Sequence, residues 1–326
     1  MHMNRRQLML GTVGAALSGA TPLLRAAGYP ERPITFICPW PAGGTGDMTM
    51  RALCVAAASA LGQPVVVENR AGASGMLGLK ALAMARPDGY TVGQIPISVT
   101  RFSQLGSVQV DPMKDLTYLA RTSGQTFGIA VRADSPHKTL KDFVAAAKAA
   151  PGKLTYGSAG VGGATHVGME EFAMAAGIEL NHVPYKGGAP ALQDLLGGQI
   201  DALADSSSWA PHVKSGKLRL LATWGEQRTR EFADVPTLKD SGYDVVVDAP
   251  NGVGAPKGLD PAIEKRLREA FKAAAASPEF AAACGKIDAP LMYLDGPDYA
   301  SYVATTYRKE TQLIERLKLR ELMSKS

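Results

Sequence analysis

Two glycine-rich segments, more than a hundred residues apart, constrain this chain more than any other feature. They cover residues 39–47 and 156–166, and each follows a short apolar run that predicts a strand and precedes a segment with helical spacing. A turn with few side chains leaves backbone N–H groups free at the positive end of the helix that follows, where a carboxylate or phosphate can bind. One such turn can serve turn geometry alone. Two of them predict a small anion held from two sides.

Strand and helix patterns alternate along most of the chain, which predicts an α/β fold. The expected strands are 34–38, 63–68, 91–97, 127–131, 154–156, 182–185, 200–204 and 218–223. The expected helices include one after residue 45 with Thr45 or Asp47 as its cap and Gly62 at its end, one that reaches Arg86, and two near the C-terminus at 261–276 and 297–322. Both C-terminal helices begin with proline, whose missing N–H does no harm there.

The length of 326 residues exceeds the usual size of one hydrophobic core. We expect one domain at 28–126 and a second at 127–247. The remaining segment, 248–326, is too small to fold alone, so we expect it to return to the first domain. This arrangement predicts two lobes joined by two crossing strands, with a cleft between them that closes around a small ligand.

The N-terminal segment 1–27 has the three parts of an export signal. A charged Asn4-Arg5-Arg6 precedes a mainly apolar stretch at 8–24, and small residues follow at 26–28. The arginine pair also resembles a twin-arginine signal, so the export route stays open. No later segment is apolar enough to span a bilayer, and we expect a soluble protein outside the cytoplasm.

Charge and motifs exclude several function classes. The formal net charge is +5, but outside segment 1–27 there are 32 basic and 30 acidic residues and no basic stripe, so nucleic acid is not an expected partner. The chain has no Gly-x-Ser-x-Gly elbow, no phosphate-binding loop ending in lysine, and no histidine pair at metal-ligand spacing. We therefore expect no cofactor and no metal.

Three cysteines, Cys38, Cys54 and Cys284, cannot form a closed disulfide framework. Cys38 falls on an expected strand and Cys54 on the apolar face of the next helix. We interpret them as buried thiols, with a Cys38–Cys54 bridge left open.

Eight short stretches resemble one family in order along the chain. They are YPERPI at 29–34, GGTGD at 43–47, LGQPVVVENR at 61–70, PDGYT at 87–91, YGSAG at 156–160, HVPYKGGAPAL at 182–192, DVPT at 234–237 and APKG at 255–258. The chain resembles the receptors of tripartite tricarboxylate transporters, also called the Bug family of extracytoplasmic solute receptors. The resemblance implies a type II-like periplasmic binding fold and a non-enzymatic, monomeric receptor in the periplasm. Such a receptor captures a di- or tricarboxylate or an aromatic carboxylate and delivers it to a membrane permease.

The resemblance also implies a set of ligand-binding residues. The first turn contributes Trp40, Ala42, Gly43, Gly44, Thr45 and Asp47. The second contributes Ser158, Gly160, Gly162, Gly163, Ala164, Thr165 and His166. Apart from the resemblance, we expect Ser98, Asp205 and Ser206 to face the cleft, because each falls near the end of an expected strand. The chain departs from the usual family pattern at Trp40 and Ala42, where Phe and Pro are common, and at Ser206, where Asn is common.

Two alternatives remain open at this stage. A ligand-loaded partner of a membrane signalling protein needs the same closing cleft. A secreted hydrolase would use Ser158, His166 or Asp205, although no spacing in the sequence requires such a triad.

Overall fold

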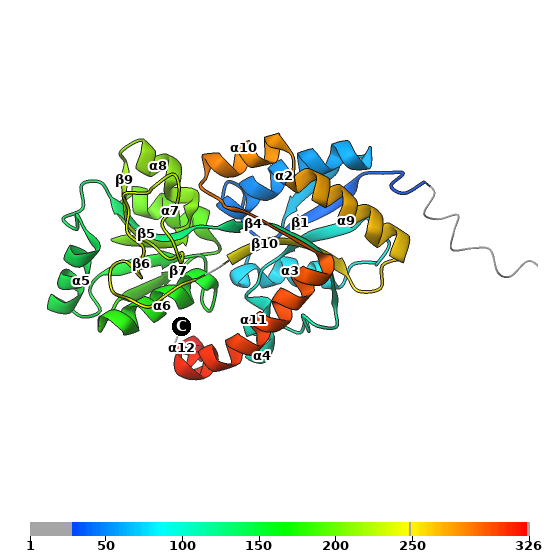
Figure 1. Ribbon diagram of the computed structural model, residues 1–326. Helices are drawn as coiled ribbons and strands as arrows, with labels where there is room; N and C mark the ends of the chain where they lie inside the picture. Colours follow the sequence, from blue (N-terminus) through cyan, green and yellow to red (C-terminus); the bar gives the residue numbers. More distant parts are fainter. Residues whose placement is uncertain (1–27, 248, 325–326) are drawn as a thin grey trace, which may run out of the picture.

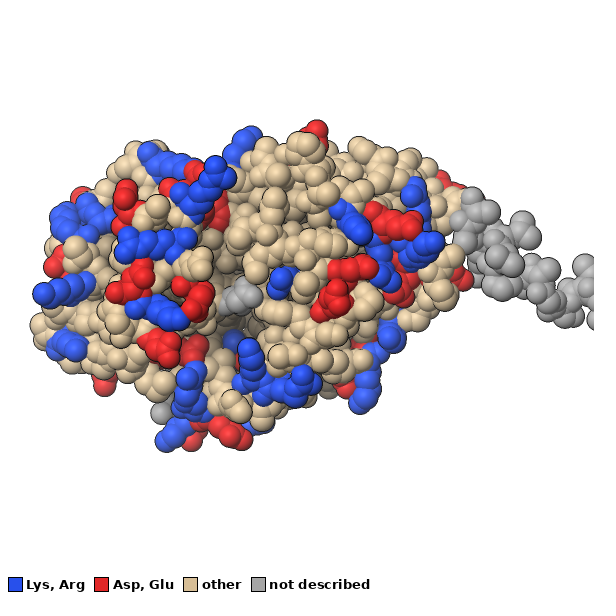
Figure 2. All heavy atoms as spheres, in the orientation of Figure 1, with Lys and Arg blue, Asp and Glu red and all other residues tan. Residues whose placement is uncertain are grey.

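Two lobes, each built on its own β-sheet with helices packed around it, form the computed structural model, which describes residues 28–247 and 249–324 (Figure 1). Both sheets mix parallel and antiparallel pairs. The expected two-lobed α/β class is therefore confirmed. Positive and negative side chains are mixed over both lobes on the face seen in Figure 2.

The first lobe contains a six-stranded sheet. Its strands lie in the order β11 (Leu291–Asp295), β4 (Leu116–Gln125), β10 (Ala249–Pro256), β3 (Thr91–Ile95), β1 (Ile34–Cys38) and β2 (Val65–Asn69). The helical elements of this lobe are α2 (Thr45–Leu61), η1 (Ala73–Gly75), α3 (Met76–Ala83), α4 (Val99–Gln104), α9 (Pro261–Ala275), α10 (Pro278–Lys286), α11 (Gly296–Arg316) and α12 (Leu319–Ser324). Strand β1 pairs in parallel with β2 and β3, whereas β10 runs antiparallel to β3 and β4.

The second lobe contains a five-stranded sheet. Its strands lie in the order β7 (Asn181–Pro184), β6 (Thr155–Ser158), β8 (Ala202–Ser206), β5 (Phe127–Arg132) and β9 (Leu218–Thr223). Its helical elements are α5 (Leu140–Ala149), α6 (Ala164–Ala176), α7 (Gly188–Leu196), η2 (Ser207–Trp209) and α8 (Ala210–Lys214).

Two strands connect the lobes side by side. Strand β4 ends at Gln125, and the single residue Thr126 separates it from β5 in the other sheet; Gln125 lies opposite Ala249 at the start of β10. Because both crossings are paired backbone at the same place, they can act as one hinge. The two crossing strands that the sequence predicts are confirmed.

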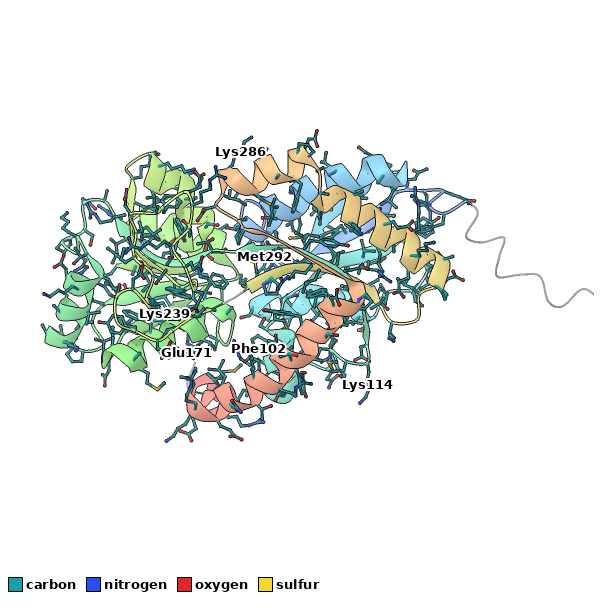
Figure 3. All side chains as sticks on the ribbon, viewed as in Figure 1. Phe102, Lys114, Glu171, Lys239, Lys286 and Met292 are labelled. Atoms are coloured by element: carbon teal, nitrogen blue, oxygen red, sulfur yellow. The ribbon has the colours of Figure 1, made fainter. Side chains whose placement is uncertain are left out.

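A second contact between the lobes lies at the C-terminal helices. Val167 of α6 is buried against Ile314 of α11 and Leu319, and α11 runs from the first lobe toward α6 (Figure 1). Figure 3 shows Phe102 of the first lobe and Glu171 of the second at this side of the molecule.

The apolar stripe that predicts the first helix is confirmed, since Met50, Leu53, Cys54, Ala57 and Leu61 are all buried on α2. Gly62 ends this helix in the left-handed conformation, with φ of 72°. The predicted side-chain cap is wrong, however. Gly44 is the N-cap, and no side chain accepts a hydrogen bond from the first turn.

Several other boundaries differ from expectation. Helix α3 ends at Ala83 rather than at Arg86, and α4, α10 and β11 were not expected. The single helix expected at 297–322 is interrupted between α11 and α12, where Lys318 has φ of 47°.

The three cysteines are free and buried, so the Cys38–Cys54 bridge does not form. Burial raises the pKa of the Cys38 thiol to about 12 and also raises the pKa of the Cys54 thiol. Thiols that stay protonated in this way suit a packing role. The export signal expected at 1–27 lies outside the described residues. Within residues 28–247 and 249–324, no helix is long and apolar enough to cross a bilayer.

Candidate functional site

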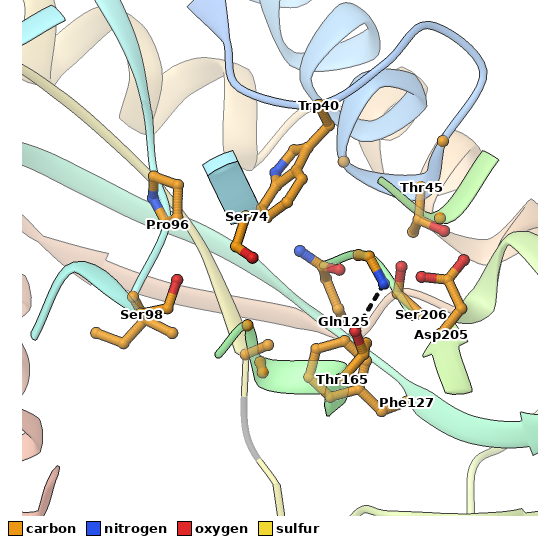
Figure 4. Close-up of a pocket in the computed structure, with 18 of the residues that line it drawn as sticks. Trp40, Thr45, Ser74, Pro96, Ser98, Gln125, Phe127, Thr165, Asp205 and Ser206 are labelled. Carbon is orange, nitrogen blue, oxygen red and sulfur yellow. Dashed lines mark hydrogen bonds between the residues drawn. The ribbon is translucent and has the colours of Figure 1, made fainter. Parts of the chain in front are cut away.

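A cavity lies between the lobes, and both glycine-rich turns contribute to its wall (Figure 4). Its volume is about 60 Å³ when measured as the space open to the centre of a water molecule, enough for roughly four or five waters. The lining residues are Trp40, Pro41, Gly44, Thr45, Gly46, Ser74, Gln94, Pro96, Ile97, Ser98, Gln125, Phe127, Ala159, Gly163, Ala164, Thr165, Gly188, Asp205, Ser206, Ala249 and Pro250.

The first wall is the turn between β1 and α2 together with the first residues of α2. The indole of Trp40 packs on Gly46 so closely that a Cβ at residue 46 would lie 2.4 Å from Trp40 Cδ1. Trp40 Nε1 and Thr45 Oγ1 are buried and have no hydrogen-bond partner. This wall therefore presents two unused side-chain donors beside the N-terminus of a helix.

Asp47 does not line this cavity, contrary to the sequence-based prediction. Its carboxylate accepts hydrogen bonds from Gly43 N at 2.9 Å, Arg51 Nε at 3.0 Å and Asn69 Nδ2 at 2.7 Å. Its negative charge is therefore used to hold the turn in place. Ala42 and Gly43 are exposed and lie outside the cavity as well.

The second wall is the turn between β6 and α6. Gly163 is the N-cap of α6 and lines the cavity with Ala164 and Thr165. The hydroxyl of Thr165 accepts a hydrogen bond from Ala159 N at 3.1 Å and so braces the turn (Figure 4).

Four predicted residues of this turn lie behind the cavity wall: Ser158, Gly160, Gly162 and His166. Gly162 N donates to His166 Nδ1 at 3.0 Å, and the His166 ring stacks on His182 with centroids 4.0 Å apart. Ser158 Oγ lies 2.7 Å from His182 Nε2. These residues support the turn and do not line the cavity.

Both imidazoles of this stack are neutral at ordinary pH. Burial lowers the pKa of His166 to about 3 and that of His182 to about 4. The contact of 3.9 Å between His166 Nε2 and Glu170 is therefore not an ion pair. Ser158, His166 and Asp205 do not form a hydrolytic triad, because Ser158 contacts His182 instead and Asp205 lies on the cavity.

Asp205 and Ser206 end strand β8 and line the cavity as predicted. Asp205 is 3% exposed, and its Oδ2 accepts a hydrogen bond from Ser208 Oγ at 2.5 Å. Burial raises its pKa to about 6, opposed by the hydrogen bonds from Ser208 and Ser206. Ser98, also predicted, lies on the cavity at the start of α4.

The sequence analysis missed several lining residues. Ser74 adopts φ of 53°, a conformation unusual for serine, and no sequence motif marks it. Gln94 precedes the end of β3, whereas Gln125 and Phe127 flank the crossing between the sheets. For Gln94, Gln125 and Phe127, a position at or near a strand end was the one sequence signal that could have placed them on the cavity.

The charge of the lining is unusual for an anion site. Among the described residues that line it, Asp205 is the only one with an ionisable side chain, and none is Lys, Arg or His. Among the described residues, no group of three or more His, Cys, Asp or Glu could hold a metal ion. An anion in this cavity would therefore be held by neutral donors and helix N-termini.

Two side chains of the first lobe hold the second glycine-rich turn directly. Ser74 Oγ of the first lobe donates to Val161 O of the second at 2.8 Å, and Arg101 Nη1 donates to Gly162 O at 2.8 Å. Both acceptors belong to the second glycine-rich turn, and residues of both turns line the same cavity.

Comparison with known proteins gives a consistent result. Residues 49–319 match the model of the tripartite tricarboxylate transporter family receptor. A Cupriavidus necator protein described as a UPF0065 protein in the gbd 5′ region is 42% identical over 97% of this chain and 96% of its own length. Protein BugT of Bordetella pertussis is 35% identical over 86% of this chain and 89% of its own length.

Solved structures show the same architecture. A periplasmic transporter is 32% identical, with a TM-score of 0.86 over 89% of this chain and 99% of its own. A Rhodopseudomonas palustris protein solved with adipate is 26% identical, with a TM-score of 0.84 over 89% of this chain and 98% of its own. MatC of the same organism, solved with bound malate, is 25% identical, with a TM-score of 0.79 over 90% and 100% of the two chains.

Proposed function

We propose that this chain, which belongs to the tripartite tricarboxylate transporter receptor family, captures a small carboxylate in the periplasm and delivers it to a membrane permease. The members of this family are solute-binding receptors and not enzymes. Relatives of this fold solved with adipate and malate support a carboxylate as the ligand.

The observation that carries the proposal is the convergence of two helix N-termini, those of α2 and α6, on one cavity between the lobes. Their free N–H groups favour a negative charge without any cationic side chain.

We propose ligand contacts for the predicted residues that line the cavity. They are Trp40, Gly44, Thr45, Ser98, Gly163, Ala164, Thr165, Asp205 and Ser206. We also propose domain bounds of 28–126 with 248–326 for the first lobe and 127–247 for the second, because the chain crosses between the sheets next to residues 126 and 249.

Isothermal titration of the purified protein with succinate, malate, adipate, citrate and benzoate tests carboxylate capture. Thr45→Val removes a buried, unpartnered hydroxyl on the cavity and should weaken binding at least about tenfold, since a hydrogen bond to a charged group contributes roughly 1.5–3 kcal/mol. Thr49→Val is the matched control, because the Thr49 hydroxyl bonds only Thr45 O within the same helix. Absence of binding across the panel, with no small acid released from denatured native protein, would contradict the proposal.

A further inference from the structure

We propose that Asn251, which does not itself line the cavity, is a positioning residue for ligand binding. Its side-chain amide orients Gln94 and Gln125, two side chains of the cavity wall, and ties them to the strands that cross between the lobes. This inference rests on the proposed function, because it concerns the same cavity, and it adds a residue that acts there through its neighbours.

The amide of Asn251 on β10 is fully buried and has a hydrogen-bond partner at every position. Its Oδ1 accepts from Gln94 Nε2 and from Gln125 Nε2, both at 2.9 Å. Its Nδ2 donates to Ser123 Oγ at 3.1 Å and to Gly124 O at 3.2 Å. Because a backbone carbonyl can only accept, Gly124 O fixes which end of the amide faces the two glutamines.

The backbone beside Asn251 departs from a regular sheet. Asn251 pairs with Ser123 and Gly252 pairs with Arg121, so Thr122 is an extra residue on β4. The Thr122 hydroxyl donates to Asn251 O at 3.2 Å. A β-bulge of this kind re-aims side chains locally and is common beside functional sites. Here it lies next to the crossing between the lobes.

The two donors to Oδ1 distinguish this amide from an ordinary buried asparagine. Both are side chains that line the cavity, and neither is backbone. Gln94 belongs to β3, whereas Gln125 is the last residue of β4 at the lobe crossing, and Figure 4 shows its side chain among the cavity residues. Loss of the Asn251 amide would therefore release two parts of the cavity wall at once.

This network of amides ends at the cavity. Gln94 is 1% exposed, and its Oε1 is buried without a hydrogen-bond partner. Buried amide oxygens are rarely left in this state, and a network that served packing alone would satisfy them. Because Asn251 Oδ1 holds Gln94 Nε2, the oxygen of Gln94 is the end that a bound molecule or a water can use. Asn251 thus decides which hydrogen-bonding group this wall offers.

The expected effect follows from preorganisation. A glutamine that rotates freely in the empty cavity loses rotamer freedom when a ligand binds, and this loss weakens binding. Asn251→Ala frees both glutamines and lets each amide reverse. We expect the variant to bind about tenfold more weakly than wild type.

Titration calorimetry tests this with the acid that wild type binds most tightly, chosen from succinate, malate, adipate, citrate, benzoate and any acid released from denatured native protein. Asn251→Ala is measured alone and in a protein that also carries Gln94→Met and Gln125→Met. A residue that acts through the glutamines should lower affinity about tenfold when they are present and less than about twofold when they are absent. A residue that serves only the fold would lower stability and leave affinity unchanged.

Asn251→Asp is the second variant, in case Asn251→Ala does not fold. A protonated aspartic acid keeps the pattern, since its carbonyl accepts from both glutamines and its O–H donates to Gly124 O, whereas the carboxylate has no donor. Burial raises the pKa of such a group, so the variant should bind as wild type at pH 5. Its affinity relative to wild type should then fall at least about fivefold by pH 9, as the introduced carboxyl ionises.

Two titratable groups of the protein itself enter this comparison. Asp205 has a pKa of about 6, so each affinity is divided by that of wild type at the same pH. The Cys284 thiol beside Ser123 stays protonated, because burial raises its pKa to about 11. Asn181→Asp, the same change at an exposed position on β7, is the control and should follow wild type at every pH.

The outcomes separate the two proposals. Wild-type affinity in Asn251→Ala, or a constant affinity ratio for Asn251→Asp from pH 5 to pH 9, overturns the positioning role and leaves carboxylate capture intact. Equal losses of affinity with and without the glutamines also overturn it, because Asn251 would then act independently of them. If wild type binds no acid and releases none, both proposals are overturned.

Discussion

Arg101 of α4 and Glu310 of α11 form a buried bidentate ion pair, with Arg101 Nε to Glu310 Oε2 and Arg101 Nη2 to Glu310 Oε1 both 2.8 Å. The same guanidinium donates through Nη1 to Gly162 O in the other lobe. One side chain of the first lobe therefore joins two of its helices to the glycine-rich turn that forms the second wall of the cavity. Because the planar fork of arginine supplies all three bonds, lysine cannot replace it.

We expect Arg101→Lys to favour the open form of the protein. The variant loses the bond to Gly162 O and leaves Glu310 incompletely paired, and breaking a buried pair destabilises a protein by roughly 3–5 kcal/mol when a partner is removed outright. Small-angle scattering of the ligand-free protein should give a larger radius of gyration than wild type. Arg228→Lys, at an exposed ion pair with Asp240 inside the second lobe, is the control and should scatter as wild type. An unchanged radius in Arg101→Lys would show that this contact does not hold the lobes closed.

Gly46→Ala should displace Trp40 and weaken ligand binding while the fold persists. The added Cβ would meet Trp40 Cδ1 at 2.4 Å, well inside contact distance, and the indole can move away only by leaving its place on the cavity wall. The other two tryptophans, Trp209 and Trp224, are fully buried, so increased acrylamide quenching of fluorescence reports Trp40.

Gly285→Ala provides the matched control. This glycine lies in helix α10 with nothing within 4 Å of its would-be Cβ, so alanine should stabilise the protein by up to about 1 kcal/mol and leave quenching unchanged. Wild-type quenching in Gly46→Ala would mean that the indole adapts without leaving the wall.

The local part of the site could be predicted from the sequence, because a strand, a glycine-rich turn and a helix are encoded by adjacent residues. Thr45 and Thr165 follow such turns, and both line the cavity. Asp47 follows the same pattern, yet the prediction that it lines the cavity is wrong. Its carboxylate is held by Asn69, which lies 22 positions away on strand β2. No local signal shows that the carboxylate is already engaged.

Residues that depend on long-range placement could not be found in this way. Gln94 and Asn251 are 157 positions apart and meet only because β10 returns to the first sheet beside β3. Ser74 reaches the cavity through a left-handed backbone conformation that glycine usually adopts. Helix α10 and strand β11 come after the chain has returned to the first lobe through β10. Their apolar patterns are too short to predict either element from the sequence alone.

Acid should destabilise the protein through the histidine stack. Burial lowers the pKa of His166 from 6.5 to about 3, so this group contributes stability that is fully present above pH 6.5 and is lost as pH falls toward 3. Each pH unit below 6.5 then costs up to about 1.4 kcal/mol for this group. His166→Asn places an oxygen near the position of Nδ1 and can still accept from Gly162 N. Urea unfolding at pH 7 and pH 5 should show a smaller loss of stability in this variant than in wild type, and an equal loss would contradict the assignment.

For Asp205 the dependence of folding stability on pH has the opposite sign, and this makes Asp205 the sharpest test of the site. Burial raises its pKa from 3.8 to about 6, so its contribution to stability is fully present below pH 3.8 and is lost as pH rises through 6. The cost of ionising it in the ligand-free protein is about 3 kcal/mol at most, since one pKa unit corresponds to about 1.36 kcal/mol. Asp205→Asn should therefore be more stable than wild type at pH 8 and no more stable at pH 3.5, whereas Asp134→Asn, at an exposed ion pair with Arg132, should show no such gain. A residue kept at a cost to stability, on the wall of a cavity between the lobes, is expected when its charge serves the ligand rather than the fold. If Asp205→Asn is less stable than wild type at both pH values, the carboxylate is structural, and its place on the cavity wall is incidental.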